Sequence, residues 1–77
     1  MNKDRRKRLE EITEQLQELH NELDELCCEE QEAFDNMPES IQNSERGECA
    51  QTKIDTIGDA MTDLESAIDN LTEVLGD

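Results

Sequence analysis

Aromatic residues are almost absent from this chain of 77 residues, which has no Trp, no Tyr and Phe34 as its one Phe. Only 32% of the residues are hydrophobic. In chains below roughly 80 residues, a single core rarely supplies more than about 3 to 5 kcal/mol of stability. We therefore expect one small domain without a substrate cavity of its own, and predict that the protein is not an enzyme and has no catalytic residues.

Basic residues are also scarce, because 7 Lys and Arg stand against 22 Asp and Glu, and the net charge is −15. Such a surface repels phosphate backbones and anionic lipids, so we expect neither direct nucleic-acid binding nor membrane binding. No apolar run approaches the roughly 20 residues of a membrane span. The basic stretch from Lys3 to Arg8 leads into an amphipathic segment rather than an apolar signal-peptide core. We expect a soluble cytoplasmic protein whose partners carry basic sites.

Disulfide and metal frameworks are not expected either. The three cysteines, Cys27, Cys28 and Cys49, are an odd number, and the first two are adjacent, which suits free thiols in a reducing compartment. Together with His20 they could suggest a zinc site. Adjacent cysteines point about 100° apart on a helix, however, so four ligands would not converge. We predict no metal and no cofactor.

The order of the residues predicts helices where composition alone would suggest disorder. In both halves of the chain apolar residues recur at alternating steps of three and four, which is the spacing of a heptad seam. The first seam consists of Leu9, Ile12, Leu16, Leu19, Leu23, Leu26 and Ala33, with Glu30 as its one polar interruption. The second consists of Ala50, Ile54, Ile57, Met61, Leu64, Ile68, Leu71 and Leu75. Each seam is one face of an amphipathic helix that needs a partner to bury it.

One turn separates the two seams. Asp35 or Asn36 can cap a helix, and Pro38 suits a first helical turn because its ring has no amide hydrogen to leave unsatisfied. We predict an all-α fold with a single domain over residues 1–77: a helix over about 3–34, a turn over about 35–38 and an antiparallel helix over about 38–75. Gly47 and Gly58 leave the continuity of the second helix open. A single long helix in a parallel coiled coil is the rival, which Pro38 disfavours.

Folding the chain at this turn brings together seam positions whose residue numbers add to about 73. Gly47 then faces Leu26, and the end of the second seam lies opposite the chain start, where it has no partner. Ala60, Ala67 and Val74 widen the apolar face of the second helix, as a bundle of more than two helices requires. We therefore expect a homodimeric four-helix bundle or a higher oligomer. The predicted partner interface consists of Ile68, Leu71, Val74 and Leu75.

The same register gives each basic residue an acidic neighbour. Arg46 would lie near Glu29 and Lys53 near Glu22. The basic start, Lys3 to Arg8, would lie beside Glu65, Asp69 and Glu73. Ion pairs that fix the register are therefore the structural explanation of these basic residues, and contact with an anion is the functional one.

The segment near the turn departs from the seam pattern, since polar residues and Gly47 occupy positions where apolar residues would be expected. One interpretation is a recess that holds a small polar or anionic ligand. Its predicted ligand-binding residues are Ser40, Asn43, Ser44 and Arg46. The other interpretation is that Gly47 only makes room for Leu26. A separate apolar tip, Phe34, Met37 and Ile41, could dock on a partner.

The whole chain resembles a family of short acidic helical-hairpin proteins of phages and mobile elements of gut bacteria. The start at residues 2–7 reads Asn-Lys-Asp-Arg-Arg-Lys, and residues 29–48 read Glu-Glu-Gln-Glu-Ala-Phe-Asp-Asn-Met-Pro-Glu-Ser-Ile-Gln-Asn-Ser-Glu-Arg-Gly-Glu. The second stretch is the distinctive part. The resemblance implies a bacterial host, and small proteins of such elements often counteract host defence, which is an analogy.

Three hypotheses follow. The first is a counter-defence protein that sequesters a small immune-signal nucleotide in the recess, with Arg46 on its phosphates. The second is an acidic protein inhibitor that uses an acidic ridge or the apolar tip to dock on a host defence protein, either imitating nucleic acid or binding an apolar site. The third is an architectural helical module without a ligand.

Overall fold

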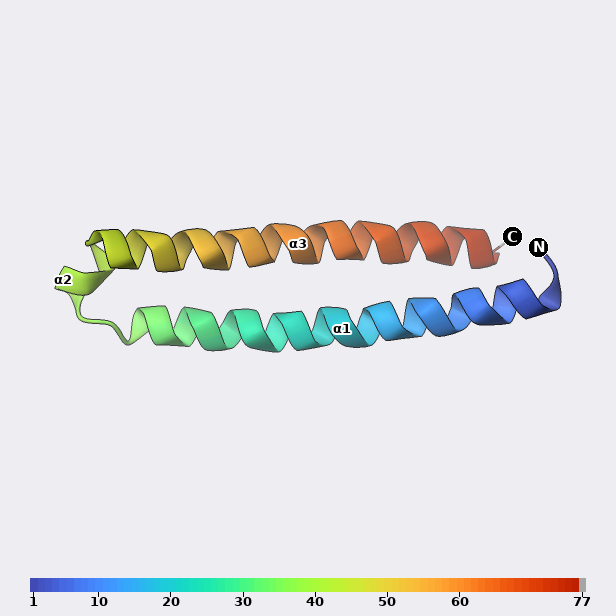
Figure 1. The fold of residues 1–77 in the computed structure, drawn as a ribbon, viewed down its shortest axis with the longest axis horizontal. Coiled ribbons are helices and arrows are strands. Elements are labelled where there is room, and N and C mark those ends of the chain that lie inside the picture. The colour runs from blue at the N-terminus through green and yellow to red at the C-terminus, as the bar shows by residue number, and fades with distance from the viewer. Residues whose placement is uncertain (77) are drawn as a thin grey trace.

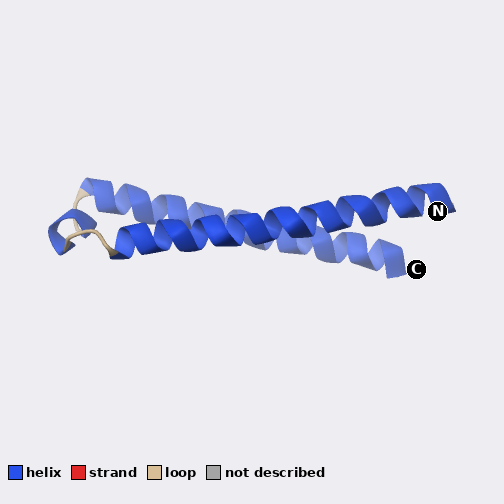
Figure 2. Ribbon diagram, turned by 90° about the horizontal axis from the view of Figure 1, so that it is seen from below, coloured by secondary structure: helices blue, strands red, loops and turns tan. Residues whose placement is uncertain are grey.

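The computed structural model describes residues 1–76 and contains two long antiparallel helices joined by a short one (Figure 1). The long helices are α1 (Lys3–Asp35) and α3 (Glu45–Gly76), and α2 (Glu39–Gln42) lies in the bend between them. They cross at a shallow angle (Figure 2) and form a rod with extents of 58 × 15 × 13 Å. The predicted all-α hairpin is therefore confirmed. None of the described helices combines the length and apolarity needed to cross a bilayer.

Capping hydrogen bonds and Pro38 determine where helix α1 begins and ends. The side-chain carbonyl of Asn2 accepts a hydrogen bond from the backbone N–H of Arg5 at 2.9 Å, which satisfies one free donor of the first turn. No Gly or Pro interrupts the next 33 residues. At the other end, the N–H of Asn36 donates to the carbonyl of Glu32 at 3.0 Å. Pro38 follows, and because it disfavours helical geometry in the residue before it, the helix cannot continue.

The second helix, expected over residues 38–75, is instead divided into α2 and α3. The break falls at Asn43 and Ser44, and α3 is continuous through both Gly47 and Gly58. The Ser44 hydroxyl accepts a long hydrogen bond of 3.5 Å from the N–H of Gly47, and its carbonyl accepts one of 3.0 Å from Glu48. Ser44 is therefore an N-cap that starts a new helix. Sequence reasoning had placed Ser44 inside a helix and missed this cap.

The register of the hairpin differs from the expected one by about twelve residues. His20 of α1 contacts Glu65 of α3, and these two numbers add to 85 rather than 73. The shift arises because residues 36–44 form the bend and pair with neither long helix. Gly47 consequently packs against the backbone of Ile41 and Gln42 in α2 and not against Leu26.

This register removes the reason for the predicted partner interface. Ile68, Leu71 and Leu75 are half-buried. Residues on the same level of the two helices have numbers that add to about 85, so these three lie level with residues 17, 14 and 10 of α1. The premise that they lack a partner within the hairpin is wrong. The interface itself stays a prediction. The basic start of α1 is likewise not level with Glu65 or Asp69, which lie opposite residues 20 and 16.

The hairpin has very little fully buried core. Ile54 is the one buried hydrophobic side chain among the described residues, at 7% exposure, and Gly47 is the other buried residue. These two residues are one heptad apart in α3, next to the bend. Most seam residues are half-buried, and several large ones are exposed. Two helices leave part of each apolar face open, as their geometry requires.

Candidate functional site

The four predicted ligand-binding residues lie close together in the chain at the bend. Ser40, Asn43 and Arg46 are exposed. The Ser44 hydroxyl is used locally, because it donates to the carbonyl of Ile41 and caps α3. The open groove on the neighbouring part of α3, about 530 Å³, is lined by Glu45, Glu48, Cys49, Thr52 and Lys53. None of the four predicted residues lines it.

The charges at the bend also disfavour an anion. The N-terminus of a long helix attracts anions, because its free N–H groups and the helix dipole are both positive there. In α3 this position already carries Glu45 and Glu48 in the first turn. These carboxylates stabilise the helix end themselves. They would repel a phosphate placed beside Arg46.

The predicted apolar tip is partly covered. Phe34, Met37 and Ile41 are all half-buried. The side-chain amide of Gln42 donates to the carbonyl of Phe34 at 3.0 Å and to that of Asp35 at 3.4 Å, which ties α2 to the end of α1. The apolar side chains therefore help to hold the bend together, and less of their surface is free for a partner.

Acidic side chains dominate the accessible surface. Every Asp and Glu within residues 1–76 is exposed. The described residues contain a single ion pair, between His20 and Glu65, so Arg46 and Lys53 do not form the expected pairs with Glu29 and Glu22. The register explains this, because it moves both basic residues about ten positions away from those partners.

Seven of these carboxylates form an acidic ridge along α1. They recur at steps of three and four on the side of the helix that faces away from α3, and all are exposed. The acidic ridge consists of Glu11, Glu14, Glu18, Glu22, Glu25, Glu29 and Glu32. It extends for about 31 Å at 1.5 Å per residue. No Lys or Arg occurs between Arg8 and Arg46 to neutralise it.

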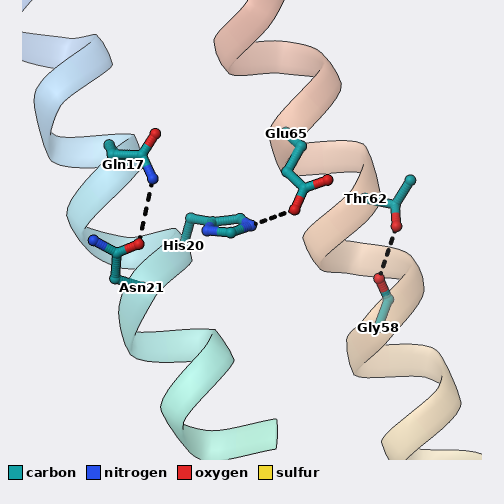
Figure 3. A network of polar contacts seen from close by, with 6 residues as sticks. All are labelled: Gln17, His20, Asn21, Gly58, Thr62 and Glu65. Carbon is teal, nitrogen blue, oxygen red and sulfur yellow. Dashed lines mark hydrogen bonds and ion pairs between the residues drawn. The ribbon is translucent and has the colours of Figure 1, made fainter.

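His20 links the two long helices. Its Nε2 donates to a Glu65 carboxylate oxygen at 2.8 Å, since a carboxylate can only accept (Figure 3). The His20 side chain is 15% exposed, and its Nδ1 is buried without a hydrogen-bond partner. Within residues 1–76, no three His, Cys, Asp or Glu side chains converge as metal ligands. Sequence reasoning considered His20 as a possible zinc ligand, and the wrong register hid its neighbour Glu65.

His20→Leu is expected to raise the free energy of unfolding by about 1 kcal/mol. The substitution removes the cost of the buried, unpartnered Nδ1 and adds apolar contact in the seam. The lost pair contributes little, because the Glu65 side chain is 58% exposed and its charge is screened by water. Urea unfolding followed by circular dichroism measures the change. Glu65→Gln, which removes only the charge, is the control, with an expected change below about 0.5 kcal/mol. A clear loss of stability in His20→Leu would contradict the prediction.

Comparisons with protein-family models, with curated proteins and with solved structures found no match for this chain.

Proposed function

We propose that this protein is a non-enzymatic binding protein that docks its acidic ridge on a basic, nucleic-acid-binding site of another protein. The resemblance to phage and mobile-element proteins favours a partner from a bacterial defence system. Bound in this way, the chain occupies the site that nucleic acid would otherwise enter and so inhibits its partner.

The acidic ridge carries this proposal, because folding does not explain it. Like charges at i,i+4 on a helix destabilise it by about 0.2 to 0.5 kcal/mol per pair. The ridge places several such pairs in sequence, for example Glu14 with Glu18 and Glu18 with Glu22, and none is relieved by a Lys or Arg. A basic partner would relieve this repulsion, which nothing within the described residues does.

The charge spacing of the rod also fits nucleic-acid mimicry. A net charge of −15 along 58 Å corresponds to one negative charge per about 3.9 Å, which is 58 divided by 15. A nucleic-acid strand carries one charge per roughly 3.4 Å. A basic groove that binds phosphates at that spacing would therefore meet a comparable average charge along the rod.

Sequestration of a nucleotide remains a prediction that ranks below this proposal. Arg46 is exposed and forms no ion pair among the described residues, so it is accessible to a ligand. Glu45 and Glu48 oppose an anion at the same place, and the described grooves do not include the predicted recess.

The test is affinity capture from a bacterial host, followed by competition with duplex DNA. The variant Glu14→Lys, Glu18→Lys, Glu25→Lys changes the charge of the ridge by +6. It should lower capture of a specific protein at least about tenfold, while helix content stays unchanged or rises. The matched control, Asp59→Lys, Asp63→Lys, Glu73→Lys, makes the same charge change on exposed positions of α3 and should retain capture.

Three results would contradict the proposal: equal losses in both variants, a captured protein that duplex DNA does not displace, or capture that is insensitive to salt. Native mass spectrometry of the purified protein tests the nucleotide prediction in parallel. An added mass of a few hundred daltons that is released on unfolding and absent from Arg46→Ala would favour sequestration instead.

A further inference from the structure

An apolar face runs along one side of the hairpin. On α1, Ile12, Leu19 and Leu26 are 48%, 51% and 44% exposed, and their spacing of seven keeps them nearly in line. On α3, Ala60, Ala67 and Val74 have the same spacing and are exposed, Val74 at 44%. The observed register places these residues in level pairs across the two helices. The pairs are Leu26 with Ala60, Leu19 with Ala67 and Ile12 with Val74.

The row of apolar residues on α1 and the row on α3 lie on the same side of the rod. A groove of about 410 Å³ is lined by Leu19, Leu23 and Leu26 of α1 and Leu64 of α3, with Glu22 at its edge, so this side is continuous across both helices. The His20–Glu65 contact is made on the opposite edge of the α1–α3 seam, since His20 is about 100° around α1 from Leu19. The face alternates large residues on α1 with small residues on α3, which suits the interdigitation of a second layer of helices.

The accessible area shows how much surface a partner must cover. A folded monomer of 8.8 kDa is expected to expose about 4,800 Å², whereas this chain exposes 6021 Å². The excess is roughly 1,200 Å² per chain, and it combines the elongated shape of the rod with its partly open apolar faces. Covering it in two identical chains buries about 2,400 Å² in total, which lies within the range of obligate homodimers. A second copy of this chain has the required area, length and chemistry.

The pattern on α1 is symmetric about Leu19, and its charges are complementary. Ile12 and Leu26 lie seven residues to either side of Leu19. Arg8 and Glu30 lie eleven residues to either side, and both are exposed. Arg8 borders Ile12 in a small groove at the start of α1. A two-fold axis beside Leu19 therefore brings Ile12 of one copy to Leu26 of the other, and Arg8 to Glu30.

A parallel arrangement lacks this complementarity, because it would place Arg8 beside Arg8 and Glu30 beside Glu30. It would also bring the acidic bends of both copies together. The antiparallel arrangement instead places the basic start of each chain, which forms no ion pair within residues 1–76, next to the acidic end of α1 in the other. It also accounts for Glu30, the residue that interrupts the α1 seam.

We propose that a second copy of this chain packs antiparallel on the face formed by Ile12, Leu19, Leu26, Ala60, Ala67 and Val74, with the two-fold axis beside Leu19. The assembly is a four-helix bundle. This face differs from the interface predicted from the sequence and shares only Val74 with it. The acidic ridge stays outside this face apart from Glu22, which lines the groove at its edge. The inference does not depend on the proposed function.

The first experiment is sedimentation equilibrium over a range of protein concentrations. The wild-type chain should sediment as a dimer of two 8.8 kDa chains. Leu19→Glu should raise the dimer dissociation constant at least about 30-fold, as expected for a central interface residue. Asn21→Glu adds the same charge about 200° further around α1 and should leave the dimer intact. A monomeric wild type, or a dimer that Leu19→Glu does not weaken, would overturn the proposal.

A cross-linking experiment tests the orientation with variants that remain folded. In a background where Cys27, Cys28 and Cys49 are replaced by Ala, Leu19→Cys should form disulfide-linked dimers in oxidised glutathione. Ile12→Cys alone should not, but a mixture of Ile12→Cys and Leu26→Cys chains should cross-link. Efficient linking of Ile12→Cys to itself would establish a parallel dimer and overturn the antiparallel arrangement.

Discussion

Gly47→Ala is expected to lower the free energy of unfolding by about 1 to 3 kcal/mol, the cost of forcing an extra methyl group into a filled space. The added Cβ would collide with the backbone carbonyls of Gln42 and Ile41, and a backbone cannot rotate aside as a flexible side chain can. Gly47 has no positive φ, so the lack of space and not the backbone conformation requires glycine. Urea unfolding with circular dichroism measures the change.

Gly58→Ala is the matched control, because it makes the same substitution in the same helix. A Cβ at Gly58 meets nothing within 4 Å, and alanine favours the helix by up to about 1 kcal/mol. The two variants should therefore change stability in opposite directions. Equal stabilisation by both would show that α2 does not pack on the start of α3, and the bend described here would be wrong.

The sequence contains enough information for the helices but not for their register. The two heptad seams and Pro38 predict two long antiparallel helices, and both are present. Register depends on how many residues the bend uses, and this number is set by the Ser44 cap and by the contact of Gly47 with α2. A Ser inside an apparently continuous helical pattern is a weak signal, because serine is common at exposed helix positions as well.

Some site predictions depended only on the spacing of residues along one helix, and others depended on the register between the two helices. The sequence predicted an acidic ridge without naming its residues, and the seven carboxylates that form it on α1 depend on helical spacing and not on the register. The pairing of Arg46 with Glu29 and the placement of the partner interface required the register itself, and both lost their basis when it moved by twelve residues. Because His20 lies at the edge of the α1 seam, a contact with α3 could have been expected from the sequence. Its partner Glu65 could be identified only from the structure.

The two proposals reinforce each other through charge density. Two antiparallel copies carry a charge of −30 along nearly the same 58 Å, or one negative charge per about 1.9 Å. Duplex DNA carries one per roughly 1.7 Å of helix axis. The bundle would therefore present a duplex-like charge to a basic groove, whereas one hairpin matches a single strand. Binding that requires the dimer should weaken in Leu19→Glu even though the ridge is unchanged.

Ile54→Ala is expected to remove most of the stability of the hairpin, with a loss of about 2 to 4 kcal/mol. Ile54 is the one buried hydrophobic side chain of the described residues, so its truncation loses transfer energy and leaves a cavity that two rigid helices cannot fill. A chain of this size has only about 3 to 5 kcal/mol to lose. Urea or thermal unfolding should show a largely unfolded variant at temperatures where the wild type is folded.

Ile57→Ala is the control, because it deletes the same atoms one turn further along α3 at a half-buried position. Its cost should be half that of Ile54→Ala or less. Both variants should be measured at several protein concentrations, since dimerisation adds stability by mass action and would otherwise mask the loss. A cost for Ile57→Ala equal to that for Ile54→Ala would place the core in the middle of the bundle, buried by the second copy, rather than next to the bend.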